Sequence, residues 1–320
     1  MFVLASNGAL MHRLILNSLG FIFATLFVLY FFDLINYNYN DNPDINNYSI
    51  NFHGEYWSYD LGFEIYQSLV RDLLKLDFYS FWLISLVLIA VLYVINSAKE
   101  LPQVPFMIIN YFFLAKTFGT QIRYFIAALL FISALNFLRK KKALIAMLLA
   151  SFFHYGILFV FFNYIISNLL LKKADKFKKH ILAIFLSIFV VYFLSGILVQ
   201  VLLPYTRFNY YSDSFYMESK SLISLFYCFL SFSFICYFFS HNKQNNIDIA
   251  IPFSIVLLYS VLCSSAIAVL SGRLLLVYLI VEPLVAKSIF KSDRRLYFIF
   301  LIICSIKALP MLYSFFEKNI

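Results

Sequence analysis

Charged residues are scarce in this chain: Asp, Glu, Lys and Arg together make up 13% of its 320 residues, while hydrophobic residues make up 63%. A soluble globular domain carries about 25% charged residues. The low charge therefore excludes an ordinary soluble enzyme and predicts a polytopic membrane protein. The 40 Phe and 24 Tyr residues fit this class, because they supply bulk for lipid contact and for aromatic belts at the membrane interfaces.

Cysteine is rare as well, and its four positions exclude two kinds of site. Cys228, Cys236, Cys263 and Cys304 all lie in apolar runs, and no CxxC or Cys/His metal spacing occurs. Buried thiols in such runs behave as small hydrophobic side chains. The sequence therefore predicts neither a disulfide nor a zinc site.

The motifs of nucleotide-dependent and metal-dependent catalysis are also missing. The chain has no P-loop, GxSxG, HExxH, GxGxxG or DxD-like metal pair. Catalysis without a metal or a nucleotide requires a substrate that already carries a good leaving group. We therefore expect no cofactor and no bound metal.

What the chain does contain is a series of apolar stretches, which predicts an all-α fold in a single integral membrane domain, residues 1–320. About 11 membrane segments are expected, near residues 14–32, 78–96, 101–117, 122–138, 143–153, 155–171, 181–203, 221–240, 249–270, 273–290 and 296–315. The formal net charge is +9, but most basic residues gather in loops that lie inside when the N-terminus is cytoplasmic. The charge is therefore a topology signal, and no nucleic-acid partner is expected.

Residues 143–171 form the most unusual of these stretches. Over 29 positions they contain no acidic or basic residue except His154, and basic clusters flank both ends. One membrane helix needs about 20 apolar residues and two need about 40, so the stretch is too long for one and too short for two full helices. Basic segments prefer the cytoplasmic side, so both ends are expected inside. The stretch is therefore predicted to be a two-helix hairpin that breaks at residues 151–156, with His154 at its apex.

Two loops are expected on the outer side, at residues 33–77 and 204–220. In the first, apolar residues recur at helical spacing from Leu61 to Leu76, which predicts an amphipathic helix over residues 61–77 along the interface. Glu64, Arg71 and Asp72 are expected on its wetter side. The second loop mixes tyrosines with carboxylates and amides, a composition that suits sugar binding. An interfacial tyrosine belt explains that composition equally well.

Three arginines lie outside the loops that are expected on the cytoplasmic side. Arg123, Arg207 and Arg273 are all expected near the outer membrane boundary, and Arg123 and Arg273 are each expected to open a helix. Arginine offers a planar fork that matches phosphate oxygens, and the first N–H groups of a helix also favour anions. The set therefore indicates a binding site for a lipid-linked phosphate or diphosphate. The alternative is snorkelling to lipid headgroups or pairing with nearby carboxylates.

Candidates for proton transfer are few. Asp60 and Glu64 are four residues apart, hence on one helical face, and one of them could accept a proton from an attacking hydroxyl while the other holds a sugar. An ordinary solvated face is the alternative. His154 could act as a base or donate a hydrogen bond to a diphosphate, and the alternative is a packing residue. Glu282 precedes Pro283 inside a segment, which favours a kinked helix with a neutral or hydrogen-bonded acid over a proton relay.

Together these pieces resemble a known family, the EpsG-like, Wzy-type polymerases of bacterial surface polysaccharides. The resemblance covers roughly residues 30–290. It rests on Asp44 and Tyr48, on Asp60-Leu61-Gly62-Phe63-Glu64 as an acidic-x-Gly-aromatic pattern, on Arg123 before an Ala-rich helix, on the basic loop at 139–142, on Phe153-His154-Tyr155, and on Arg273 followed by Leu274, Leu275, Tyr278 and Pro283. Whether Asp60 or Glu64 occupies the acidic position of the family stays open.

The resemblance implies a membrane glycosyltransferase of the GT-C type in the bacterial inner membrane, with its active site facing the periplasm. Such an enzyme transfers a growing glycan from undecaprenyl diphosphate to a lipid-linked repeat unit of O-antigen, capsule or exopolysaccharide. The partners it implies are lipid-linked oligosaccharides, membrane lipids and a chain-length regulator. Two alternatives remain: a transporter or flippase of lipid-linked sugars, and a membrane O-acyltransferase acting on polysaccharide.

Overall fold

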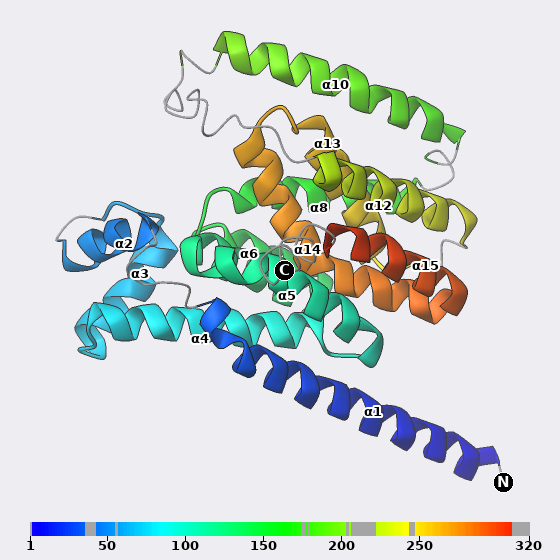
Figure 1. Ribbon diagram of the computed structural model, residues 1–320, viewed down its shortest axis with the longest axis horizontal. Coiled ribbons are helices and arrows are strands. Elements are labelled where there is room, and N and C mark those ends of the chain that lie inside the picture. The colour runs from blue at the N-terminus through cyan, green and yellow to red at the C-terminus, as the bar shows by residue number, and fades with distance from the viewer. Residues whose placement is uncertain are drawn as a thin grey trace, which may run out of the picture. The chain divides into compact units, whose positions relative to one another are not determined.

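The computed structural model describes residues 2–35, 43–54, 57–173, 177, 179–202, 205, 222–242 and 247–308, and within them every regular element is a helix (Figure 1). This confirms the all-α fold class for the described part of the chain. Contacts between residues divide the chain into two compact units, Met1–Phe161 and Phe162–Ile320. Each unit is built from helices that pack on one another.

The first unit is assembled around the helices α4 and α6. Its elements are α1 (Phe2–Tyr30), η1 (Phe32–Leu34), α2 (Pro43–His53), α3 (Leu61–Ser68), the π-helical turn η2 (Leu69–Leu73), α4 (Phe78–Ser97), η3 (Leu101–Gln103), α5 (Val104–Thr120), α6 (Ile122–Phe137), α7 (Lys140–Ala150) and the start of α8 (Ile157–Lys172). α6 packs on both α4 and α7, and α5 packs on α1 and α4. Figure 1 shows the short helices α2 and α3 beside the start of α4.

The second unit is built around α13 and α14. It contains the rest of α8 with α10 (Ile181–Leu202), α12 (Leu222–His241), α13 (Ala250–Cys263), α14 (Ala268–Ser292), α15 (Arg294–Ser305) and η7 (Ile306–Ala308). α13 packs on α10, α12 and α14, and α15 packs on α12 and α14. Pro283 lies within α14 and does not end this helix.

The helices are those of a membrane protein. Four of the described helices are long and apolar enough to cross a bilayer: Met11–Tyr30 within α1, then α4, α12 and α14. Shorter apolar helices of 10–17 residues are α6, α8, Ile181–Ile197 within α10, and α13. The chain is therefore an integral membrane protein, while the number of crossings and the side on which each loop lies stay predictions.

The predicted hairpin at 143–171 is present as two short helices. α7 ends at Ala150 and α8 begins at Ile157, so the helix break falls on residues 151–156 as expected. The start of α14 differs from the prediction, because the helix expected to begin at residue 273 begins instead at Ala268. Arg273 consequently lies in the second turn of α14. The expectation that it opens a helix and shares its free N–H groups is wrong.

The predicted helix at 61–77 is shorter than expected, and one of its side chains, Glu64, is not exposed as predicted. It comprises α3 and η2, which end at Leu73. Its exposed row is the apolar one that starts at Leu61 and Ile65, as the sequence indicated for an interfacial helix. Glu64, however, is buried rather than on the wetter side, because Asn51 of α2 lies against it. The expectation of a solvated Glu64 is therefore wrong.

Candidate active site

The candidate site forms where the start of α3 meets the turn between α7 and α8. The backbone N–H of Gly62 donates to the carbonyl oxygen of Phe152 at 2.8 Å. The two segments approach so closely that a Cβ on Gly62 would lie 3.0 Å from the Phe152 carbonyl carbon and 3.1 Å from a ring carbon of Phe153. A side chain at this position would therefore make a tight contact with the backbone of the turn, which glycine avoids. The contact fixes the residue before α3, Asp60, beside the hairpin turn.

Asp60 and Arg123 form an ion pair at this junction. The guanidinium Nη1 of Arg123 donates to Oδ2 of Asp60 at 2.7 Å, and the backbone N–H of Tyr155 donates to Oδ1 at 3.2 Å. The side chain of Asp60 is only 6% exposed and that of Arg123 is 22% exposed. One carboxylate thus joins three separate segments: the start of α3, the first turn of α6 and the hairpin turn.

Aromatic rings hold the guanidinium of Arg123 in place. Its central carbon lies 3.8 Å from the ring centroid of Tyr59, and about 6 Å from those of Tyr48 and Phe63, at 6.0 and 5.9 Å. Burial raises the pKa of Tyr59 to about 12, so this ring stays neutral and offers its electron-rich face to the cation. Within the described part of the chain, the Nε of Arg123 is buried without a hydrogen-bond partner. Stacking on the rings and the carboxylate of Asp60 are thus described contacts that hold the arginine.

The ionisation of Asp60 depends on two opposing effects. Burial raises the pKa of the Asp60 carboxyl, whereas the Arg123 guanidinium and the N–H of Tyr155 lower it, and burial is the larger effect. A carboxylate has about four acceptor positions, so Asp60 can accept a further hydrogen bond beside those from Arg123 and Tyr155. Its raised pKa makes it a better proton acceptor than an ordinary solvent-exposed aspartate.

Glu64 faces away from this ion pair. Its Oε1 accepts hydrogen bonds from the backbone N–H of Tyr59 at 2.7 Å and from Nδ2 of Asn51 at 3.1 Å. Asn51 in turn accepts from the backbone N–H of Ser58 at 3.3 Å. This buried network ties the segment 57–60 to α2 and α3. Glu64 therefore holds the backbone that carries Tyr59 and Asp60.

His154 lies on the same turn as Tyr155. Its Nδ1 accepts the backbone N–H of Gly156 at 2.9 Å, and its ring meets the ring of Tyr124 edge-on with 5.2 Å between centroids. Because a backbone N–H can only donate, the accepting Nδ1 carries no proton in this arrangement, so the neutral ring has its proton on Nε2. Tyr124 follows Arg123 in α6, so this contact ties the histidine to the helix that bears the arginine.

The family of the chain is shown by comparison with known protein families. The sequence matches the EpsG family over residues 21–320, nearly the whole chain. The chain belongs to the EpsG family. No curated protein and no solved structure matches it. Membership confirms the family resemblance, and it indicates that this membrane protein is a glycosyltransferase-like polymerase of polysaccharide synthesis.

Not all the predicted site residues of this EpsG-family protein are brought together. Asp60 and Arg123 meet at the hairpin turn, which also carries His154, and Glu64 supports Tyr59 from α3. Arg273 belongs to the second unit, and Arg207 lies outside the described residues, as does nearly all of the predicted loop 204–220. The joint arginine site therefore stays a prediction, and Arg123 is the member whose surroundings are known.

The structure adds aromatic residues that spacing alone did not select. Tyr59 stacks on Arg123, and Asn51 orients Glu64. Tyr48 was part of the family resemblance, and it proves to be a buried neighbour of the same guanidinium. A tyrosine directly before an acidic residue at a helix start is a weak signal in a chain with 24 tyrosines, so Tyr59 could not be found from sequence.

A second buried ionic cluster lies in the second unit, around Glu282 of α14. Its carboxylate pairs with Lys307 and accepts a hydrogen bond from the hydroxyl of Tyr227. The thiol of Cys304 also donates to it at 3.0 Å. The hydrogen-bonded acid expected from the sequence is confirmed, while Lys307 was not anticipated. The ion pair joins α14 to η7, and the hydrogen bond from Tyr227 joins α14 to α12. These contacts indicate a role in holding the helices together.

Proposed function

We propose that this EpsG-family protein polymerises lipid-linked oligosaccharide repeat units at the periplasmic face of the bacterial inner membrane. It would transfer a growing glycan from undecaprenyl diphosphate to a hydroxyl of a second lipid-linked repeat unit, for O-antigen, capsule or exopolysaccharide. The observation that carries the proposal is the buried Asp60–Arg123 pair at the hairpin turn of a chain that belongs to this family. It combines an anion-binding cation with a proton acceptor.

The reaction needs no external cofactor. The bond between the anomeric carbon and the diphosphate oxygen breaks, and the acceptor oxygen forms the new bond to that carbon. The diphosphate leaves with the bonding electron pair, and the hydroxyl proton passes to the carboxylate of Asp60. Diphosphate is already a good leaving group, so the protein has to stabilise negative charge on it rather than protonate it.

Arg123 is assigned to the diphosphate. A guanidinium has five N–H donors in a planar fork, and Asp60 takes one of them in this structure. The rings of Tyr59 and Phe63 keep the fork from turning, so the donors are positioned before the substrate binds. Preorganised donors are effective because they need no rearrangement as charge develops. Arg207 and Arg273 remain proposed as further contacts to the same diphosphate.

The remaining groups have separate roles. Asp60 is the proposed base, since its oxygens lie at the junction and burial raises its pKa. Glu64 is a positioning residue, because its contacts hold Tyr59 and Asn51. His154, whose neutral ring carries its proton on Nε2, is proposed to donate to a diphosphate or acceptor oxygen.

Purified protein supplied with lipid-linked repeat units tests the proposal directly. A ladder of polymer is expected, whereas translocation alone would indicate a flippase and acylated product an acyltransferase. Arg123→Ala should reduce the rate by about 10²–10³-fold, as loss of a preorganised donor does. Arg123→Lys should restore little, because a point charge cannot replace a stacked fork.

The matched control is Arg13→Ala. Arg13 forms the ion pair with Glu100 at 2.9 Å, also within the first unit, but that pair lies at the opposite end of α4 from α3. Its loss removes one positive charge and one ion pair without touching the site, so the ladder should be unchanged. Equal activity of Arg123→Ala and Arg13→Ala would overturn the assignment of Arg123.

A further inference from the structure

An apolar groove begins at the hairpin turn and runs between α6 and α7. It has a volume of about 380 Å³ and is lined by α6 over residues 130–138, by Ala146 and Ala150 among others on α7, and by Phe153. All of its lining residues except Ser133 are apolar. The groove therefore suits a hydrocarbon chain and offers little to a sugar or a phosphate.

The groove begins beside the hairpin turn, and this turn also forms one side of the candidate site. Phe153 lines it and also lies against Gly62, the residue that docks α3 on the turn. On the other wall, Leu130 follows Arg123 by seven residues in α6, which is about 10 Å along a helix. A molecule whose diphosphate meets Arg123 thus has the start of its tail within about 10 Å of this groove.

A cationic site joined to an apolar groove selects an amphiphile with a negatively charged head. In a membrane, burying a hydrocarbon chain gains little free energy by itself, since the surrounding lipid is equally apolar. Preference for one chain over another must come from shape. Ala134, Ala146 and Ala150 have the smallest side chains of the apolar lining. We expect the space beside them to accommodate the methyl branches of an isoprenoid better than an unbranched acyl chain, which would leave voids.

We propose that this groove binds the isoprenoid tail of the lipid diphosphate, in the part nearest the diphosphate. The inference rests on the proposed function, because it places the tail of the same substrate. Residues 130–138 span about 12 Å of helix, whereas the hydrocarbon core of a bilayer is about 30 Å thick. The groove therefore holds only the first part of the tail, and the rest lies in the lipid.

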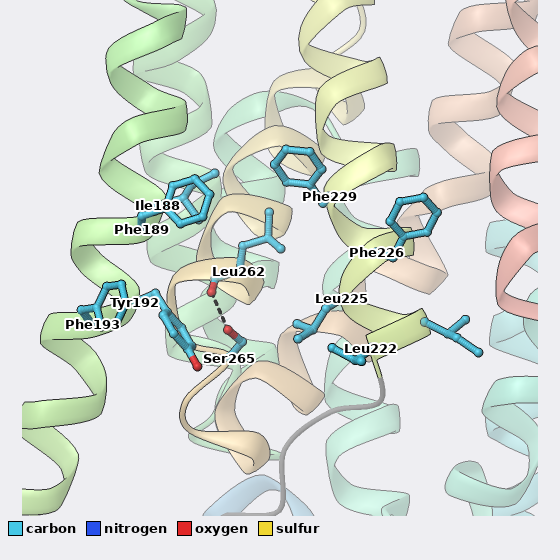
Figure 2. A pocket seen from close by; sticks show the side chains of 11 residues that line it. Ile188, Phe189, Tyr192, Phe193, Leu222, Leu225, Phe226, Phe229, Leu262 and Ser265 are labelled. Carbon is cyan, nitrogen blue, oxygen red and sulfur yellow. Dashed lines mark hydrogen bonds between the residues drawn. The ribbon is translucent and has the colours of Figure 1, made fainter.

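A larger apolar groove, of about 810 Å³, lies in the second unit between α10 and α12. Figure 2 shows Phe189 and Phe193 of α10 on one side and Phe226 and Phe229 of α12 on the other. Among the described residues its lining contains no basic side chain, so no described residue there would hold an anionic head. The groove between α6 and α7 is the one that shares a wall with a cationic site.

Direct binding to the purified full-length protein tests the assignment. The probes are farnesyl diphosphate, an unbranched alkyl diphosphate of the same main-chain length, and inorganic diphosphate. Farnesyl diphosphate should bind about fivefold more tightly than the unbranched probe, which corresponds to about 1 kcal/mol. Ala146→Trp, which fills the groove, should make the two affinities equal and leave inorganic diphosphate unaffected.

The matched control is Ile145→Trp, which adds a similar ring at the adjacent, 62% exposed position of α7. It should keep the preference for the branched tail. Retention of that preference by Ala146→Trp, or its absence from the unsubstituted protein, would overturn the groove assignment. Failure of the proposed function looks different: Arg123→Ala would then bind inorganic diphosphate as tightly as the unsubstituted protein does.

A second measurement covers the case in which Ala146→Trp fails to fold. In the variant Ala146→Cys, bound farnesyl diphosphate should slow modification of the new thiol by a maleimide about fivefold or more, while inorganic diphosphate should not. The native thiols are all buried and react slowly. Ile145→Cys should be modified at the same rate with and without either probe. Equal protection, or no protection, at both positions would count against the groove.

Discussion

Replacing Gly62 with alanine tests the contact on which the whole site depends. The added Cβ would lie 3.0–3.1 Å from the backbone carbonyl of Phe152, the group that accepts the Gly62 N–H. Both neighbouring atoms are backbone, so they can move away only if the hairpin turn shifts. Gly62 does not have a positive φ, so the strain of an alanine here comes from the close contact and not from backbone conformation. A shift of the turn would also draw the N–H of Tyr155 away from Asp60.

The expected loss of stability follows from three effects. Overpacking typically costs about 1–3 kcal/mol, and weakening a backbone hydrogen bond costs about 0.5–1.5 kcal/mol. Gly62 is the second residue of α3, where alanine recovers up to about 1 kcal/mol of helix propensity. The net destabilisation of the first unit by Gly62→Ala should therefore be about 1–3 kcal/mol, with polymer synthesis strongly reduced.

Unfolding of the two units can be followed with two separate probes, tryptophan fluorescence and thiol reactivity. Both tryptophans, Trp57 and Trp82, lie in the first unit, and all four cysteines lie buried in the second. In a denaturant titration in detergent, Gly62→Ala should lower the midpoint seen by tryptophan fluorescence more than the midpoint seen by a thiol-reactive dye. Wild-type stability and a normal polymer ladder in Gly62→Ala would show that the close approach does not exist.

Gly272→Ala is the matched control for this experiment. A Cβ at Gly272 meets no atom within 4 Å, and the residue lies inside α14. The exchange should therefore leave stability unchanged or raise it by up to about 1 kcal/mol, detected by the thiol-reactive dye. Equal destabilisation by the two exchanges would show that loss of glycine, rather than its contact, is responsible.

Further predictions concern the buried charges and the topology. Lys307→Met leaves the carboxylate of Glu282 without its cation and should destabilise the second unit by about 3–5 kcal/mol, measured with the thiol-reactive dye. Adding Glu282→Gln to this variant should recover much of the lost stability. No recovery would contradict the pairing. Polymerisation should fall as the pH drops through the pKa of Asp60, which burial raises above the ordinary value of about 3.9. In Arg123→Gln, this acid limb of the residual activity should move to higher pH, because the guanidinium no longer favours the carboxylate; an unmoved limb would exclude Asp60 as the base. A cysteine in place of Lys142 should be labelled only from the cytoplasm. Labelling from the periplasm would contradict the predicted topology.

Most of the apolar helices could be placed from the sequence, whereas α2 lies in a stretch that was expected only as part of an outer loop. The segment predicted at 78–96 is α4, Phe78–Ser97, and the break in the hairpin falls at 151–156 as expected. Apolar runs and their basic flanks determine these positions, since a helix satisfies its backbone within one segment. The start of α14 was missed by five residues, because Ala268 and its neighbours are as apolar as the preceding helix.

The partners of the site residues could not be read in this way. Sequence spacing placed Asp60 and Glu64 on one face, yet Asp60 meets Arg123 of α6, while Glu64 is buried against Asn51 of α2. Lys307 lies within the segment predicted at 296–315, and nothing in the sequence indicated that it pairs with Glu282.

Hydropathy and helix periodicity act within a single segment, so the sequence by itself determined the membrane class, the helices and the hairpin break. Which side chains pair depends on which helices meet, and that choice is made by close packing between segments far apart in the chain. Gly62 allows α3 to reach the carbonyl of Phe152, and this approach places Asp60 beside Tyr155. Only the tertiary structure therefore decided that an acid and an arginine 63 residues apart form one buried site.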